Sequence, residues 1–289
     1  MVLWVFLQTI SAFFLSSSDA LSKKLLQTNN SKFVAFGKIL VSAILVCIFA
    51  LLFAKSTYNF LVWMAIIVAA FLDTLNVLLY MKAIQISDFS KTAPFTAFTP
   101  IGISIVSFFI NHEFPTTIGF FGIMLGMAGG YVVNLNKIKE GLHAPIKEIF
   151  SNRGTMLTLA SVAVLSVEVP INRFAVKHSD PIFAVALMLT FMTLFLFLFS
   201  IKDVKNIPGQ ISTNVKPLLL IGTLGAASSI LSFFALSLIQ AAYANTVKRL
   251  GVLFTVLYGH FIYKEKDIEQ HMLAVALMLA SVLILAFYG

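Results

Sequence analysis

The sequence predicts an all-α integral membrane protein with ten transmembrane helices, arranged as two inverted repeats of five helices each. Three observations predict this fold class. The composition suits hydrocarbon better than water, ten apolar runs approach the length of a membrane span, and a polar stretch divides these runs into five and five.

The composition leaves too few charges for a soluble fold. Hydrophobic residues make up 59% of the 289 residues and charged residues only 11%, with a mean hydropathy of +0.96. Soluble domains carry about 25% charged residues. We therefore expect much of the surface to face lipid, where every backbone polar group must be satisfied within the protein.

Ten apolar runs approach the roughly 20 residues that a membrane-spanning helix needs. The first five are Val2–Ser22, Phe33–Ala54, Phe60–Ala83, Ser90–Asn111 and Thr117–Leu135. The second five are Gly154–Val176, Ile182–Ile201, Pro217–Ile239, Ala244–Tyr263 and His271–Tyr288. The first run lacks the positively charged segment that precedes a cleaved signal sequence, so we expect it to remain as the first helix.

The stretch between the two sets of runs is the most polar in the chain. It predicts a first five-helix repeat over residues 1–136, a polar linker over 137–153 and a second repeat over 154–289. Five crossings is an odd number, so the second repeat must enter the membrane from the opposite side. Inverted repeats are the architecture of many secondary transporters, whose binding site lies between the repeats.

Aligning the two halves brings matching charges together. Asp19 falls on Glu168, and each acid is followed five residues later by a base, Lys24 or Arg173. Near the ends of the fourth and ninth runs, Glu113 falls on Glu265 in the same way. This internal similarity indicates a duplicated unit.

Several segments resemble a known family along nearly the whole chain. They are Tyr80–Ile84, the stretch from Pro94 to Pro100, Asn111–Glu113, Lys248–Leu257, Tyr263–Glu265 and the glycines of the fifth run, Gly119, Gly122, Gly126, Gly129 and Gly130. In these segments the chain resembles the drug/metabolite transporter superfamily, in particular its EamA-type ten-helix transporters. The second half departs from the pattern at Val252, which takes the place of Pro100. The resemblance implies a central cavity lined by both repeats, alternating access and cytoplasmic termini.

The third run carries a polar stripe. Asp73, Asn76 and Tyr80 lie three and four residues apart, which places them on one helical face. An ionisable residue inside the membrane costs about 2.5–3.5 kcal/mol on insertion scales. The stripe therefore predicts the lining of a substrate or proton path. The alternative is a structural hydrogen-bond cluster against a neighbouring helix.

The matched acids Asp19 and Glu168 are candidates to bind a coupling ion. They would face each other across the axis that relates the repeats and bind a cation or relay protons. The alternative is that each forms an ion pair near a helix end. Pro170 follows Glu168 and frees a backbone carbonyl, which favours a local break of the kind that forms transporter sites. We place Glu168 and Asn172 in the predicted substrate site as well.

Two adjacent cations open the ninth run. Lys248 and Arg249 lie in its second turn, and Asn245 precedes Arg249 by one turn. A cation pair of this kind binds carboxylate or phosphate. The alternative is that both side chains extend back to the membrane interface.

Hydroxyl and glycine residues in other runs predict close helix packing. Ser228 and Ser232 in the eighth run suit bonding between helices. Gly119, Gly122, Gly126 and Gly130 form a ladder typical of tightly packed helices, either within the chain or in a homodimer.

Other function classes find no support in the sequence. There is no H-E-x-x-H pair, no phosphate loop with G-K-[ST], and only one cysteine, Cys47. We expect no enzyme activity, no metal and no cofactor. The net charge of +8 comes from basic residues in short gaps between apolar runs. That pattern anchors loops at a membrane, and we expect no nucleic-acid partner.

The predicted function is a secondary transporter, an exporter of a small polar or amphipathic metabolite, in the inner cell membrane. Its partners are the solute, the lipid bilayer and protons, unless it runs as a facilitator. The alternative is a membrane-embedded sensor or lipid-handling protein that transports no solute. Basic residues concentrate in the gaps after odd-numbered runs, which places both termini outside. The resemblance implies the reverse. The prediction follows the resemblance, because an error of one helix in the count would corrupt the charge tally.

Overall fold

The computed structural model of the chain describes residues 3–56, 59–87, 96, 98–132, 153–200, 207–254, 257–258 and 271–288. Within these residues the secondary structure is helical, with no strand. The first half contains α1 (Leu3–Leu26), α2 (Ser31–Phe53), α3 (Phe60–Ile86), α5 (Thr99–Asn111) and α6 (Thr117–Val132). The second half contains α8 (Arg153–Lys177), α9 (Pro181–Ser200), α10 (Ile207–Thr213), α11 (Val215–Leu238), α12 (Ala241–Lys248) and α14 (His271–Tyr288).

Every predicted run overlaps one of these helices. Among the described helices, α2, α3, α8, α9 and α11 are long and apolar enough to cross a membrane. Shorter apolar helices lie in the fourth, fifth and tenth runs. Large apolar side chains such as Leu51, Leu52 and Phe109 are exposed on the outside of the bundle. The prediction of an all-α membrane protein is confirmed.

Polar caps begin three of the helices where the runs predict a start. The Asn30 side chain accepts a hydrogen bond from the backbone N–H of Lys32 and begins α2. Asn59 begins α3 in the same way. The Asp180 carboxylate accepts two backbone N–H groups at the start of α9. Such caps satisfy donors that the first helical turn leaves without partners.

Contacts between the halves follow a twofold pattern. The first helix of each half packs on the third helix of the other half, as α1 on α11 and α8 on α3. The second helices, α2 and α9, pack on each other, as do the last helices, α6 and α14. The fourth helices repeat the pattern, with α5 on α8 and α12 on α1. Exchanging the halves leaves this set of contacts unchanged, which is the arrangement expected of two five-helix repeats.

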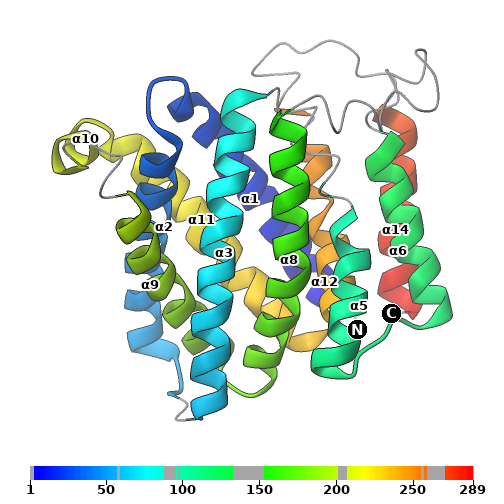
Figure 1. Cartoon of the computed structure of the whole chain (residues 1–289). Coiled ribbons are helices and arrows are strands. Elements are labelled where there is room, and N and C mark those ends of the chain that lie inside the picture. The colour runs from blue at the N-terminus through cyan, green and yellow to red at the C-terminus, as the bar shows by residue number, and fades with distance from the viewer. Residues whose placement is uncertain are drawn as a thin grey trace.

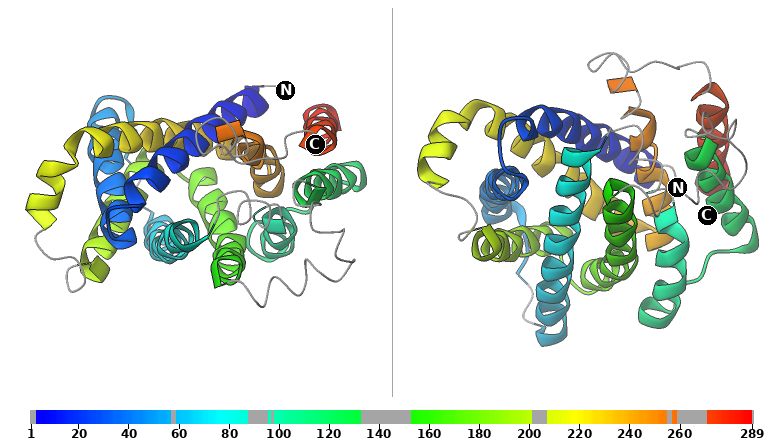
Figure 2. Two further views of the ribbon diagram at one scale, coloured as in Figure 1. Left: turned by 90° about the horizontal axis from the view of Figure 1, so that it is seen from above. Right: turned by 45° about the horizontal axis from the view of Figure 1, so that its top comes forward.

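Two pairs of helices lie opposite each other in the bundle (Figures 1 and 2). The pair α3 and α8 forms one wall, and α1 and α11 form the opposite wall. The pair α2 and α9 closes one side, and α6 with α14 lies at the far side (Figure 1). The two chain ends point toward the same end of the bundle, as an even number of crossings requires (Figure 1).

Two local expectations need correction. The helix α8 continues without interruption through Pro170, so the break expected there does not form. A break occurs instead in the ninth run, because α12 ends at Lys248 and helical residues resume at Gly251. Lys248 and Arg249 therefore lie at the end of a short helix, not in the second turn of a long one. The carbonyl of Gly251 accepts a hydrogen bond from Ser16 on α1.

The remaining expectations on boundaries stay predictions. The linker 137–153, apart from Arg153, lies outside the described residues, as do Pro94 and Glu265. The domain boundaries proposed from the sequence are therefore not tested by the helices.

The glycine ladder of α6 packs inside the chain. The backbone at Gly122 lies against Leu285 of α14, and the Ser281 hydroxyl donates to the Gly122 carbonyl at 2.6 Å. A Cβ on Gly119 would clash with the hydroxyl oxygen of Tyr243. Of the two alternatives for the ladder, the structure shows the helix interface.

Candidate functional site

A cavity of about 240 Å³ lies between the two halves. Residues from α1, α2, α3, α8, α9, α11 and α12 line it, so both repeats contribute. The structure brings all nine residues of the predicted site to this cavity: Asp19, Asp73, Asn76, Tyr80, Glu168, Asn172, Asn245, Lys248 and Arg249. Their convergence is a structural fact, while their roles in transport stay predictions.

The wall of α3 and α8 carries the acidic groups. The Asn76 side chain donates to a carboxylate oxygen of Asp73 at 2.7 Å. The Ser161 hydroxyl on α8 donates in turn to the side-chain oxygen Oδ1 of Asn76 at 2.5 Å, and this bond joins the two helices. The stripe on α3 is therefore both a hydrogen-bond cluster and part of the cavity wall.

Glu168 lies on the same wall, one turn before Asn172. It is buried, and its carboxylate accepts a hydrogen bond from the Asn172 amide. Its charged neighbours in the cavity lining are Asp73 on the same wall and Lys248 at the end of α12. The side-chain oxygen of Asn172 is buried and has no hydrogen-bond partner among the described residues.

The end of α12 supplies the basic groups. Lys248 donates from Nζ to the Ser232 hydroxyl of α11 at 3.1 Å. Arg249 donates from Nε to the Asn245 side chain at 3.0 Å. Both cations line the cavity, so their side chains point to the protein interior instead of extending to the membrane interface. The carbonyl end of a helix favours cations at this position.

Asp19 has a partner that the sequence did not predict. Its carboxylate forms an ion pair with Lys38 of α2, with 2.8 Å between Oδ1 and Nζ, and both side chains are buried. Tyr80 of α3 also interacts with this carboxylate. The alternative of a helix-end pair with Lys23 or Lys24 is not what the structure shows for Asp19.

The two matched acids therefore have different surroundings. Asp19 is neutralised by a cation, whereas Glu168 faces another carboxylate. Within the described parts of the chain, no ion pair shorter than 4.0 Å joins Asp73, Glu168, Lys248 or Arg249 to an opposite charge. Among the described residues, the cavity thus contains one closed ion pair, Asp19–Lys38, and four ionisable side chains without a direct counter-ion.

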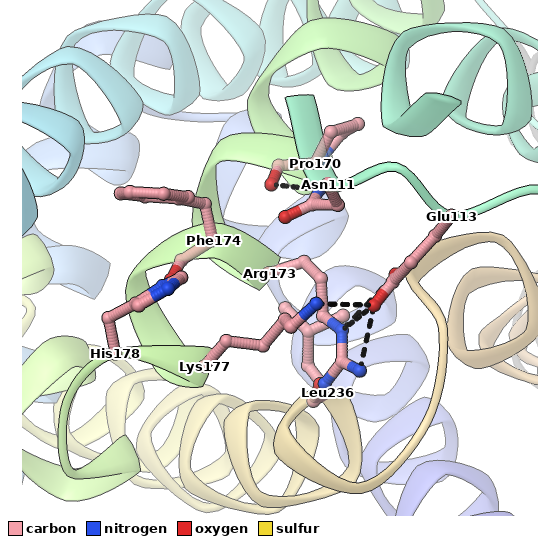
Figure 3. A network of polar contacts seen from close by, with 8 residues as sticks. All are labelled: Asn111, Glu113, Pro170, Arg173, Phe174, Lys177, His178 and Leu236. Carbon is pink, nitrogen blue, oxygen red and sulfur yellow. Dashed lines mark hydrogen bonds and ion pairs between the residues drawn. The ribbon is translucent and has the colours of Figure 1, made fainter. Parts of the chain in front are cut away.

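A second ionic cluster lies away from the cavity, near the end of α8 (Figure 3). Arg173 holds Glu113 of the α5–α6 connection through Nε and Nη2 at 3.0–3.3 Å, and Lys177 adds a contact at 3.2 Å. Arg173 also donates to the carbonyl of Leu236 at 2.6 Å. This cluster joins three helical segments, and Arg173 is the partner of Glu113, not of Glu168.

Sequence reasoning missed Lys38, although it is the one charged residue of the apolar run Phe33–Ala54. The same rule that singled out Asp73 would have found it. It also missed Gln8 and Ser161, which line the cavity. Single polar residues of this kind occur in many packed helices and carry little signal. Among the described residues, no group of three or more His, Cys, Asp or Glu side chains could hold a metal ion.

Comparisons with known proteins address the fold and the family. The model of the EamA-like transporter family matches residues 2–135 and 152–287. A solved structure, described only as "Crystal structure of protein", superposes with a TM-score of 0.72 at 14% identity, over 97% of this chain and 95% of the other. No curated protein sequence matches significantly. The structural likeness, at this identity, concerns the fold alone.

Proposed function

Because this chain belongs to the EamA-like transporter family, we propose that it is a secondary transporter that exports a small polar or amphipathic metabolite by alternating access. The observation that carries the proposal is the charged cavity between the two repeats. Ionisable groups inside a membrane protein are costly, and they mark substrate or ion pathways. A purely structural role does not account for four ionisable side chains that have no direct counter-ion within the described part of the chain.

Protons are the proposed coupling ion, with Glu168 as the group that carries them. Glu168 is buried and borders the same cavity as Asp73, so a proton on its carboxylate would lie beside the proposed solute path. Asp19 keeps its place in the proposal as the repeat-related acid. Because Asp19 already forms an ion pair with Lys38, we assign proton binding mainly to Glu168 and Asp73.

The orientation follows from where the basic residues lie. At the end of the bundle opposite the chain termini, the described basic residues are Lys23, Lys24, Lys32, Lys82, Arg153 and Lys216. At the other end they are Lys55, Arg173 and Lys177. Each predicted run overlaps a helix, so successive gaps between the runs lie at alternate ends of the bundle. We therefore place the basic end in the cytoplasm, against the family expectation. The inner cell membrane and a homodimer remain predictions without a structural argument.

The test is solute flux in proteoliposomes with an imposed pH gradient. We expect at least one small metabolite from a broad panel to move, faster when a proton gradient drives it. Glu168→Gln should abolish the effect of the gradient at normal expression, because the amide cannot exchange a proton. Asp180→Asn is the matched control, since it removes a carboxylate outside the cavity but keeps a residue that caps α9.

Two results would contradict the proposal. Full gradient-driven flux in Glu168→Gln would remove this residue from coupling. No movement of any solute, with folded protein in the vesicles, would favour the sensor or lipid-handling alternative.

A further inference from the structure

Direct contact between the two walls of the bundle is confined mainly to two crossings. Packing is extensive within each wall, between α3 and α8 and between α1 and α11. From wall to wall, α8 touches α11 sparsely and α1 touches α3 sparsely. Exchanging the halves converts one crossing into the other. A movement of one wall against the other would therefore act mainly on these two crossings.

Arg173 occupies the crossing of α8 and α11 (Figure 3). Its Nη1 donates to the Leu236 carbonyl at 2.6 Å, and its Nε and Nη2 bind the Glu113 carboxylate at 3.0–3.3 Å. Only 8% of Arg173 and 11% of the Glu113 side chain are exposed. Paired bonds between a guanidinium and a carboxylate are among the strongest in proteins. Arg173 thus joins the two walls directly, and Glu113 fixes the guanidinium that makes this bond.

This crossing lies beside the cavity, toward the end of the bundle where the two chain ends lie, here called the terminal end. Helix α8 runs from Arg153 at the basic end to Lys177 at the terminal end (Figure 1). Arg173 lies one turn before the end of this helix. Its neighbour Asn172 and its acceptor Leu236 both line the cavity. Arg173 therefore lies between the cavity and the terminal end.

The crossing of α1 and α3 at the basic end repeats the arrangement with a longer bond. There Lys23 of α1 donates from Nζ to the carbonyl of Ser87, which ends α3, at 3.4 Å. Such bonds are usually about 2.7–3.2 Å long. Lys24, which aligns with Arg173, is exposed. In each half a cation of the first helix thus bonds to a carbonyl at the end of the third helix, but the bond is short and buried only at the terminal end.

Resting on the proposed function, we propose that Arg173 is a latch that closes the cavity toward the terminal end, with Glu113 as the residue that positions it. In this structure the latch is closed. Access to the cavity from the terminal end requires α8 and α11 to separate, which breaks the bond between Arg173 and the Leu236 carbonyl. Because the basic end is placed in the cytoplasm, the latch closes the outer side.

The test measures how fast a thiol in the cavity reacts from each face of the membrane. In a Cys47→Ser background, Ser229→Cys provides this thiol. A membrane-impermeant maleimide is applied to right-side-out and to inside-out vesicles. Arg173→Gln and, separately, Glu113→Gln should each raise the labelling rate from the terminal face about tenfold or more, because a charged hydrogen bond no longer favours closure. The rate from the basic face should not rise.

Two further variants separate the latch from a general effect on folding. Lys177→Gln removes a cation that contacts the same carboxylate but is 36% exposed, and it should leave both rates near those of the parent. Arg173→Lys keeps a positive charge and N–H donors, so its rates should lie closer to the parent than those of Arg173→Gln. Should Arg173→Gln fail to fold, Glu113→Gln, which keeps the arginine, carries the test.

The outcomes separate the latch from the proposed function. A rise confined to the terminal face supports the latch. Equal rises from both faces would show a general loosening of the bundle and overturn the latch, as would unchanged rates in both variants. If the parent is labelled from both faces, either result leaves the transporter proposal intact. Labelling from one face alone, in the parent and in every variant, would overturn both proposals.

Discussion

At the residue scale, the Asp19–Lys38 pair shows how one charge is accommodated inside this bundle. Both side chains are buried, and they join α1 to α2 at 2.8 Å. Taking two charges out of water is expensive, and the pair persists because each compensates the other. Removing one partner leaves a buried charge alone.

The pair therefore predicts a specific pattern of stability. Asp19→Asn or Lys38→Met alone should lower the free energy of unfolding by about 3–5 kcal/mol. The double variant should recover most of this loss, because no uncompensated charge remains. Unfolding in detergent measures the change, and Lys82→Met, an exposed residue of α3, serves as a control with little expected effect. Additive losses in the double variant would show that the two residues act separately.

Sequence reasoning reached the cavity residues but not their partners. Asp73 and Glu168 stand out because an acid inside an apolar run is costly without a role. Which cation compensates which acid depends on how helices meet. Lys24 and Lys38 are both near Asp19 in sequence, and only packing decides that Lys38 is the partner.

At the element scale, Arg173 ties three segments together at one end of the bundle. It binds Glu113 after α5, lies on α8 and donates to the last turn of α11 at Leu236. The fold places residues 60 and 63 positions apart in sequence in contact here. The sequence pairing of Glu113 with Glu265 gave no sign of this bond.

This junction predicts a difference between two neighbouring cations. Arg173→Gln should cost about 3 kcal/mol or more of unfolding free energy, since it leaves the largely buried Glu113 carboxylate poorly compensated. Lys177→Gln should cost less than about 1 kcal/mol, because the Lys177 side chain is 36% exposed. Thermal unfolding of the two variants in the same detergent checks this order. Equal losses would mean that Arg173 contributes no more than a surface pair.

Helix existence was predictable at this scale, whereas helix interruption was not. The apolar runs marked the helices correctly. The break after Lys248 arises where Gly251 meets Ser16 of α1, a contact between distant segments. Pro170 gave the stronger local signal, but its helix continues.

At the scale of the whole molecule, the odd number of apolar runs in each half predicted the architecture. Two sets of five runs imply inverted repeats, and the helix contacts are unchanged when the halves are exchanged. The charges do not follow this symmetry, because Asp19 is paired and Glu168 is not. The helix packing is therefore symmetric between the two halves, whereas the charged lining of the cavity is not.

The central claim, that the cavity is a path and not a closed pocket, is tested most directly by two-sided labelling. In a Cys47→Ser background, Ser229→Cys places a single thiol in the cavity lining. We expect a membrane-impermeant thiol reagent to label it from either side, in right-side-out and in inside-out vesicles. Lys216→Cys, exposed at the basic end, marks sidedness and should react only from the cytoplasmic face. Labelling of Ser229→Cys from one side alone would contradict alternating access and with it the transporter account.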